Sequence, residues 1–129
     1  MNTDPIAEES PFKGQTGLCR SWNAFSYSLS GLHAAYLNED AFRQESLLAA
    51  VMIPVALVLP LTGIGKALMI GSVLLVLIVE LLNSAIEAAI DRISLDRHRL
   101  SKRAKDIGSA AVLIALINVL TTWSLVLLP

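Results

Sequence analysis

Apolar residues in this chain gather into three long runs separated by short polar segments. Residues 46–65 and 107–128 contain no charged side chain, and residues 67–90 are apolar apart from a polar stripe towards their end. A helix needs about 20 residues to cross the hydrocarbon core of a bilayer, which is about 30 Å thick. The pattern therefore predicts an all-α integral membrane protein with three transmembrane helices, over about 46–65, 67–90 and 107–128.

The segment before the first run has a different period. Its large apolar side chains recur every three or four residues, at Leu18, Trp22, Phe25, Leu29, Leu32 and Tyr36. This spacing predicts an amphipathic helix over about residues 18–36, which lies on the membrane surface or packs its apolar face on the spans. Residues 1–17 are polar and contain several prolines and glycines, so we expect a disordered tail followed by one membrane domain over residues 18–129.

Several residues indicate where helices begin and end. Asn38 is expected to cap the next helix, with acidic residues following in the first turn, where the helix dipole favours negative charge. Pro54 is expected to kink the first transmembrane helix, and Pro60 to help to end it. Glu39 and Arg43 are four residues apart, and this spacing leaves a surface ion pair and a functional role equally open.

Composition and charge support the membrane assignment. The chain is 54% hydrophobic with a mean hydropathy of +0.62, as membrane proteins are. Six of its ten basic residues lie in segment 91–106, so the positive-inside rule predicts that this segment and the N-terminus face the cytoplasm and the C-terminus the periplasm. Cys19 is the only cysteine, which excludes a disulfide within one chain, and no nucleic-acid partner is expected.

A polar stripe occupies one face of the second predicted span, because its members follow the first at intervals of three, four, seven and eleven residues. A charge near the middle of a span costs about 2.5–3.5 kcal/mol on insertion scales, and the stripe begins roughly 20 Å along the helix from Ala67. We therefore interpret the stripe as a functional site. Two alternatives are polar contacts that hold an oligomer together and carboxylate rings along an ion-conducting pore. The stripe comprises Glu80, Asn83, Ser84, Glu87 and Asp91.

The depth of each polar group indicates its chemistry. Glu80, within the apolar region, suits a general base that accepts a proton from a hydroxyl. Glu87, two turns nearer the cytoplasm, suits a magnesium ion, which prefers one or two carboxylates together with substrate phosphates. Lys105 and Asp106 lie nearest the membrane in the basic segment. Cations there suit phosphate binding. The positive-inside rule and attraction to anionic lipid also account for most of these charges.

Three stretches of the sequence carry a family resemblance: Asn38–Glu45 (NEDAFRQE), Glu80–Arg92 (ELLNSAIEAAIDR) and Arg103–Ala111 (RAKDIGSAA). In this order, and with matching span lengths, they resemble the small integral-membrane diacylglycerol kinases of bacteria over roughly Gly31 to Leu127. The departures are modest. His33 and Tyr36 stand in place of a basic residue and a tryptophan at the lipid end of the site, and the N-terminal tail is longer.

The resemblance implies a homotrimer in the bacterial inner membrane, surrounded by membrane lipids, with three spans and a surface helix in each subunit. It implies transfer of the γ-phosphoryl group of ATP to diacylglycerol with Mg²⁺ as cofactor. Undecaprenol stays open as the acceptor, because similar sequences act on it. By this resemblance Glu80 is the catalytic base, and Glu39 and Glu87 hold magnesium. Nucleotide or phosphate would be bound by Arg20, Asn83, Lys105 and Asp106, and the lipid by Ser28, Glu80 and Ser109.

Overall fold

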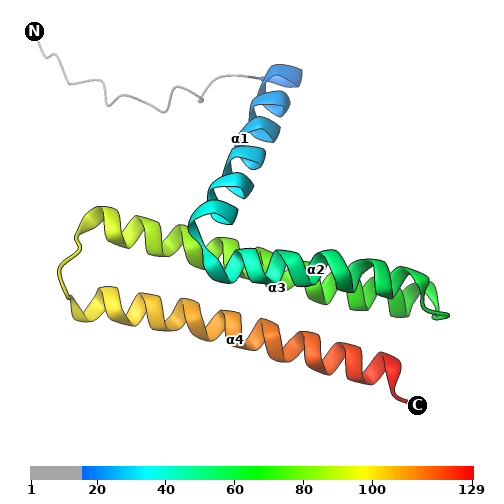
Figure 1. Cartoon of the computed structure of the whole chain (residues 1–129). Helices are drawn as coiled ribbons and strands as arrows, with labels where there is room; N and C mark the ends of the chain where they lie inside the picture. The colour runs from blue at the N-terminus through cyan, green and yellow to red at the C-terminus, as the bar shows by residue number, and fades with distance from the viewer. Residues whose placement is uncertain (1–15) are drawn as a thin grey trace, which may run out of the picture. The chain divides into compact units, whose positions relative to one another are not determined.

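The computed structural model describes residues 16–129, which form helices and short connections and no strand (Figure 1). The helices are α1 (Gly17–Asn38), α2 (Asp40–Val58), α3 (Gly63–Ile93) and α4 (Arg99–Leu127). The chain divides into two compact units, and the second, Ala35–Pro129, holds the end of α1 together with α2, α3 and α4. The all-α prediction is confirmed. The predicted disordered tail falls almost wholly on residues 1–15, which lie outside the described residues.

Three helices are long and apolar enough to cross a bilayer, as the hydropathy pattern predicts. α2 has 19 residues, α3 has 31 and α4 has 29. The predicted first span, 46–65, was placed too late, because α2 includes the charged residues before Ser46 and ends at Val58, ahead of Pro60. α3 and α4 also continue past their apolar cores into charged flanking residues, whose long side chains can reach water. Pro54 lies inside α2, and the kink expected there stays a prediction.

A single residue, Glu39, separates α1 from α2. The expectation that Asn38 caps α2 is wrong, because α1 continues through Asn38 and the N-cap position belongs to Glu39. The backbone of Glu39 is extended, with φ −117° and ψ 108°, and its side chain makes no capping hydrogen bond. Arg43 donates to carbonyl groups in the last turn of α1, which helps that helix to continue to Asn38.

Side chains cap both helix ends at the turn between α2 and α3. Thr62 Oγ1 accepts a hydrogen bond from the N–H of Gly65 at 3.1 Å, and Lys66 Nζ donates to the carbonyl of Leu57 at 2.7 Å. These bonds satisfy backbone groups that a helix end leaves without partners. They hold the two helices as a hairpin whose turn lies at the opposite end of α2 from Glu39.

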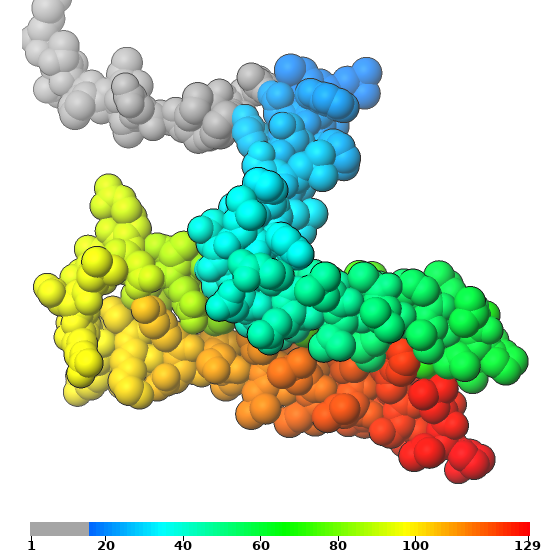
Figure 2. All heavy atoms as spheres, in the orientation of Figure 1, coloured from blue at the N-terminus to red at the C-terminus, as the bar shows by residue number. Residues whose placement is uncertain are grey.

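α3 is the central helix of the second unit and packs against both α2 and α4 (Figure 1). Its inner face buries Met69, which is fully covered, and Met69's carbonyl accepts a hydrogen bond from Trp123 Nε1 of α4 at 3.2 Å. Figure 2 shows the side chains of α4 along one edge of this unit. Its outward apolar side chains, such as Ile114 and Leu125, are largely exposed in one chain (67% and 76%) and suit contact with lipid tails.

Candidate active site

The polar stripe of α3 begins on the buried side of that helix. Glu80 is 5% exposed and Ser84 is 9% exposed, whereas Asn83 and Glu87 are half-buried and Asp91 is exposed. The polar stripe, whose five residues share one face of α3, therefore runs from the interior of the unit to its surface. A carboxylate in the interior requires a partner or a function, because an unpaired buried charge is strongly disfavoured.

The charged groups that act on Glu80 are other carboxylates rather than cations. The negative charges of Glu87 and Glu39 both act on Glu80, and that of Glu80 acts on Glu45 of α2. We call Glu39, Glu45, Glu80 and Glu87 the carboxylate cluster. Over residues 16–129, the ion pairs with lysine and arginine involve only Asp40, Asp91 and Asp106, and none includes a member of the cluster. Lys105 of α4 acts on Glu87 at longer range while it pairs with Asp91, so the cluster keeps an excess of negative charge that a bound cation would neutralise.

The cluster suits a magnesium ion that is also bound by substrate phosphates, rather than an ion enclosed by protein side chains alone. Over the described part of the chain, no three carboxylate, histidine or cysteine side chains are grouped closely enough to enclose a metal. Magnesium is commonly held by one or two carboxylates, with substrate phosphates and water completing its shell. The negative charges of Glu39 and Glu87 both act on Glu80, so these two carboxylates are the candidates for holding such an ion.

Asn83 is positioned by both α3 and α4. Its Nδ2 donates to Glu87 Oε1 at 3.4 Å, while its Oδ1 is buried without a hydrogen-bond partner. The same oxygen lies against Gly108 of α4, so closely that a Cβ on Gly108 would overlap it. Ser84 Oγ and Glu45 Oε2 are likewise buried and unsatisfied. Such groups cost about 1–3 kcal/mol each, and a ligand or ordered water is the usual partner.

A cleft of about 480 Å³ opens beyond the polar stripe, where the end of α3, the connection 94–98 and the start of α4 meet. Lys105 Nζ crosses it to Asp91 Oδ1 at 2.8 Å, and Lys102 Nζ lies 2.6 Å from Asp106 Oδ2. His98 caps α4 by accepting a hydrogen bond from the N–H of Leu100 at 3.1 Å. The volume suits a small molecule, and the cationic groups suit phosphate. The cleft is lined by Ile90, Asp91, Ser94, Leu95, Asp96, Arg97, His98, Arg99, Ser101, Lys102, Lys105 and Asp106.

The other residues implied by the resemblance belong to α4 and to the first unit. Ser109 follows Gly108 on α4 and is exposed. Arg20 and Ser28 belong to α1 in the first unit, where Ser28 Oγ donates to the carbonyl of Ala24 at 2.9 Å. The structure thus brings together Glu39, Glu80, Asn83 and Glu87, and it places Lys105 and Asp106 at the cleft.

The contributions of three residues to the site are not predicted by the sequence patterns. Glu45 joins the carboxylate cluster from α2, and the only signal for it is a carboxylate directly before an uncharged run. Gly108 shapes the position of Asn83, which the sequence indicates only as a small residue suited to helix packing. Arg43, for which an ion pair with Glu39 was one expectation, pairs instead with Asp40, Nη1 to Oδ1 at 2.8 Å.

Comparisons with known proteins agree with the resemblance of the motifs. The sequence model of the family described as prokaryotic diacylglycerol kinase matches residues 26–127. A diacylglycerol kinase of Pseudomonas aeruginosa is 60% identical over 119 residues, which cover 92% of this chain and 97% of the relative. Diacylglycerol kinases of Escherichia coli strain K12 and Helicobacter pylori strain 26695 are 52% and 41% identical over 112 residues, or 87% of this chain and 92% and 88% of the relatives. The chain therefore belongs to the prokaryotic diacylglycerol kinase family.

Proposed function

We propose that this protein is an ATP-dependent diacylglycerol kinase that forms phosphatidic acid and ADP. The observation that carries the proposal is the buried carboxylate Glu80 on the apolar helix α3, whose end, about 15 Å further along the helix axis, lines a cleft with cationic side chains. A lipid hydroxyl can approach from the membrane and a nucleotide from water. The family and the relatives named diacylglycerol kinase support the same reaction.

Glu80 acts as the general base in this proposal. It accepts the proton of the lipid hydroxyl while the hydroxyl oxygen forms a bond to the γ-phosphorus and the bond to ADP breaks. Phosphoryl transfer depends mainly on positioning and charge neutralisation, so a carboxylate beside the hydroxyl is enough to orient the nucleophile. Glu80 and Glu87 are about 10 Å apart along the helix axis, which assigns them to different parts of the reaction.

Glu39 and Glu87 are the residues that would hold magnesium. When bound, the ion neutralises phosphate charge during transfer. Asn83 donates to Glu87 through its Nδ2, and its buried Oδ1 can accept a hydrogen bond from a ligand or water that reaches it. This assignment uses the concentrated negative charge around Glu80, which lacks a cationic partner among residues 16–129.

Lys105 and Asp106 would position the nucleotide at the α3–α4 cleft. Arg20 of α1 is proposed as a further nucleotide-binding residue from the family resemblance alone. Lys105 is held by Asp91 at 2.8 Å, so its ammonium group is already directed to the wall of the cleft. Arg97, Arg99 and Lys102 line the same cleft and add positive charge for a triphosphate.

Glu80 and Ser109 are proposed to bind the lipid acceptor, and Ser28 of α1 is added from the family resemblance alone. An apolar cavity of about 380 Å³ begins beside Glu45 and runs between α2, α3 and α4, lined by residues such as Met52, Val76 and Leu116. Its apolar lining suits an acyl chain more than a sugar or a nucleotide.

We also propose that the protein is a homotrimer in the inner membrane. In this arrangement α1 is an amphipathic helix at the membrane surface, and segment 91–106 and the N-terminus face the cytoplasm.

The test is ATP-dependent phosphorylation by the purified protein in mixed micelles, with diacylglycerol and undecaprenol compared at fixed magnesium. Diacylglycerol should be the preferred acceptor, and preference for undecaprenol would change the substrate while retaining the chemistry. Glu80→Gln should lower kcat by about 10²-fold or more, the range for general bases, while the oligomer and ATP binding persist. Phosphorylation of neither lipid, together with ion flux in sealed vesicles, would replace the kinase by a conducting oligomer.

A further inference from the structure

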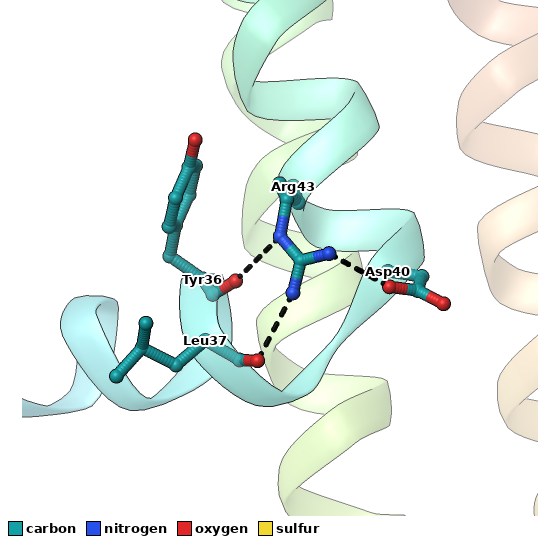
Figure 3. A network of polar contacts seen from close by, with 4 residues as sticks. All are labelled: Tyr36, Leu37, Asp40 and Arg43. Atoms are coloured by element: carbon teal, nitrogen blue, oxygen red, sulfur yellow. Dashed lines mark hydrogen bonds and ion pairs between the residues drawn. The ribbon is translucent and has the colours of Figure 1, made fainter.

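The side chain of Arg43 joins the two helix ends on either side of Glu39 (Figure 3). Its Nε donates to the carbonyl of Tyr36 at 3.0 Å, and its Nη2 donates to the carbonyl of Leu37 at 3.0 Å. Its Nη1 donates to Asp40 Oδ1 at 2.8 Å. The guanidinium carbon also lies 5.7 Å from the centre of the Tyr36 ring, within cation–π range.

These contacts satisfy groups that the break between the helices would leave without partners. The last four carbonyl groups of a helix have no intrahelical donor, and α1 ends at Asn38. Arg43 supplies donors to two of them from the first turn of α2 and anchors itself on Asp40 in the same turn. The guanidinium therefore clamps the end of α1 to the start of α2 across one intervening residue.

Glu39 is that residue, and its backbone is fixed on both sides. Its N–H donates to the carbonyl of Ala35 at 2.9 Å, and its carbonyl accepts from the N–H of Arg43 at 3.1 Å. Its side chain makes no capping bond, so the carboxylate stays available to act on Glu80. The direction of that carboxylate depends on the extended backbone between the two helices.

We propose that Arg43 is a positioning residue for Glu39: it holds the one-residue break in the conformation that directs the Glu39 carboxylate towards the cation shared with Glu87. The inference rests on the proposed metal role of Glu39. Arg43 itself is not a metal ligand, and its effect on the reaction passes through Glu39.

The geometry requires arginine rather than any cation. Three different nitrogens of the guanidinium bond three different oxygens, two of them backbone carbonyls on the other side of the break. A lysine ammonium is a point charge on a flexible stem and does not reproduce this planar fork. Arg43→Lys should therefore retain the charge and lose most of the positioning.

The test measures divalent metal affinity directly. Mn²⁺ binding to the full-length protein in micelles, in the presence of a non-hydrolysable ATP analogue, is followed by electron paramagnetic resonance, and the Mg²⁺ concentration for half-maximal activity is measured in parallel. Arg43→Gln should weaken metal affinity on the order of tenfold, as loss of an outer-shell partner does, with the KM for diacylglycerol unchanged. Arg43→Lys should fall between the native protein and Arg43→Gln.

Lys66→Gln is the matched control. It also removes a cation that bonds a helix-end carbonyl, but at the far end of α2, so metal affinity should stay at the native value. A second comparison adds Arg43→Gln to the Glu39→Gln variant. The double variant should show no further loss of metal affinity, because Arg43 acts only through Glu39. If Arg43→Gln fails to assemble, the same metal affinity is measured with Arg43→Lys, which should still bind the metal more weakly than the native protein.

The outcomes separate this inference from the proposed function. If Glu39→Gln weakens metal binding while Arg43→Gln and Arg43→Lys match the native protein, Arg43 is not a positioning residue, and the metal role of Glu39 stands. If Glu39→Gln leaves metal affinity unchanged, the proposed role of Glu39 fails first. Additive losses in the double variant would show that Arg43 acts on the site by another route and would overturn the inference.

Discussion

Gly108→Ala tests whether the close approach of α4 to α3 sets the position of Asn83. In the structure, a Cβ on residue 108 would overlap Asn83 Oδ1 and lie 3.2 Å from Asn83 Cγ. Because Asn83 belongs to α3 and Gly108 to α4, either the side chain must turn away or the two helices must separate. Either response disturbs the hydrogen bond from Asn83 Nδ2 to Glu87 Oε1.

Two opposing terms set the expected effect on stability. Overpacking a well-packed contact costs about 1–3 kcal/mol, whereas alanine in place of glycine within a helix contributes about 1 kcal/mol of stabilisation. The net loss should therefore be about 0–2 kcal/mol, which leaves the protein folded. The loss in activity should be larger than this balance suggests, because a displaced Asn83 no longer orients Glu87. A change of about 1.4–2.8 kcal/mol in the activation barrier corresponds to a 10- to 100-fold lower kcat.

The assay combines steady-state kinetics at several magnesium concentrations with thermal unfolding in the same micelles. Gly71→Ala is the control, since a Cβ at that position in α3 meets no atom within 4 Å and should leave kcat unchanged. Native kcat and native magnesium dependence in Gly108→Ala would refute the idea that this contact positions Asn83. A large loss of assembled protein with native activity per folded molecule would reduce Gly108 to a packing role.

Three more substitutions test the site and the helix ends. Glu87→Gln should raise the Mg²⁺ concentration for half-maximal activity, and an unaltered titration would remove Glu87 from the metal site. Lys105→Met should raise the KM for ATP more than Asp91→Asn does, because the half-exposed Lys105–Asp91 pair is screened by water and loss of its partner should leave the Lys105 charge in the cleft; equal effects in ATP titrations would contradict this order. Thr62→Ala should lower the unfolding free energy by about 1 kcal/mol through loss of the cap, with native kcat; unchanged thermal unfolding would show that the cap contributes little.

Hydropathy alone was sufficient for the three membrane helices, because apolar runs of the required length rarely occur outside membranes. The helix ends were less accessible. Arg43 stabilises the end of α1 from the next helix, and no local pattern indicates that α1 continues through Asn38. α2 includes charged residues that hydropathy excludes from a span, so its start lies six residues before the predicted boundary at Ser46.

The candidate site was predictable where it lies on one helix. Periodicity along α3 groups Glu80, Asn83 and Glu87 without knowledge of the fold. The contributions of Glu45 and Gly108 depend instead on which faces of α2 and α4 meet α3, and this is a property of tertiary packing. The pairing of Lys105 with Asp91 spans 14 residues and the connection between two helices, so it lies beyond the reach of local spacing rules.

The length of α3 ties the reaction to the thickness of the membrane. Its 31 residues extend about 46 Å, which exceeds a hydrocarbon core of about 30 Å by roughly three helical turns. The charged ends of α3 can take up this excess by projecting into the headgroup layer, or the helix can tilt, so in the proposed reaction the bilayer thickness would set the depth at which Glu80 meets a lipid hydroxyl. Bilayers made from shorter or longer acyl chains would shift that depth along the helix. Turnover by the same protein would then be highest in a membrane of one particular thickness.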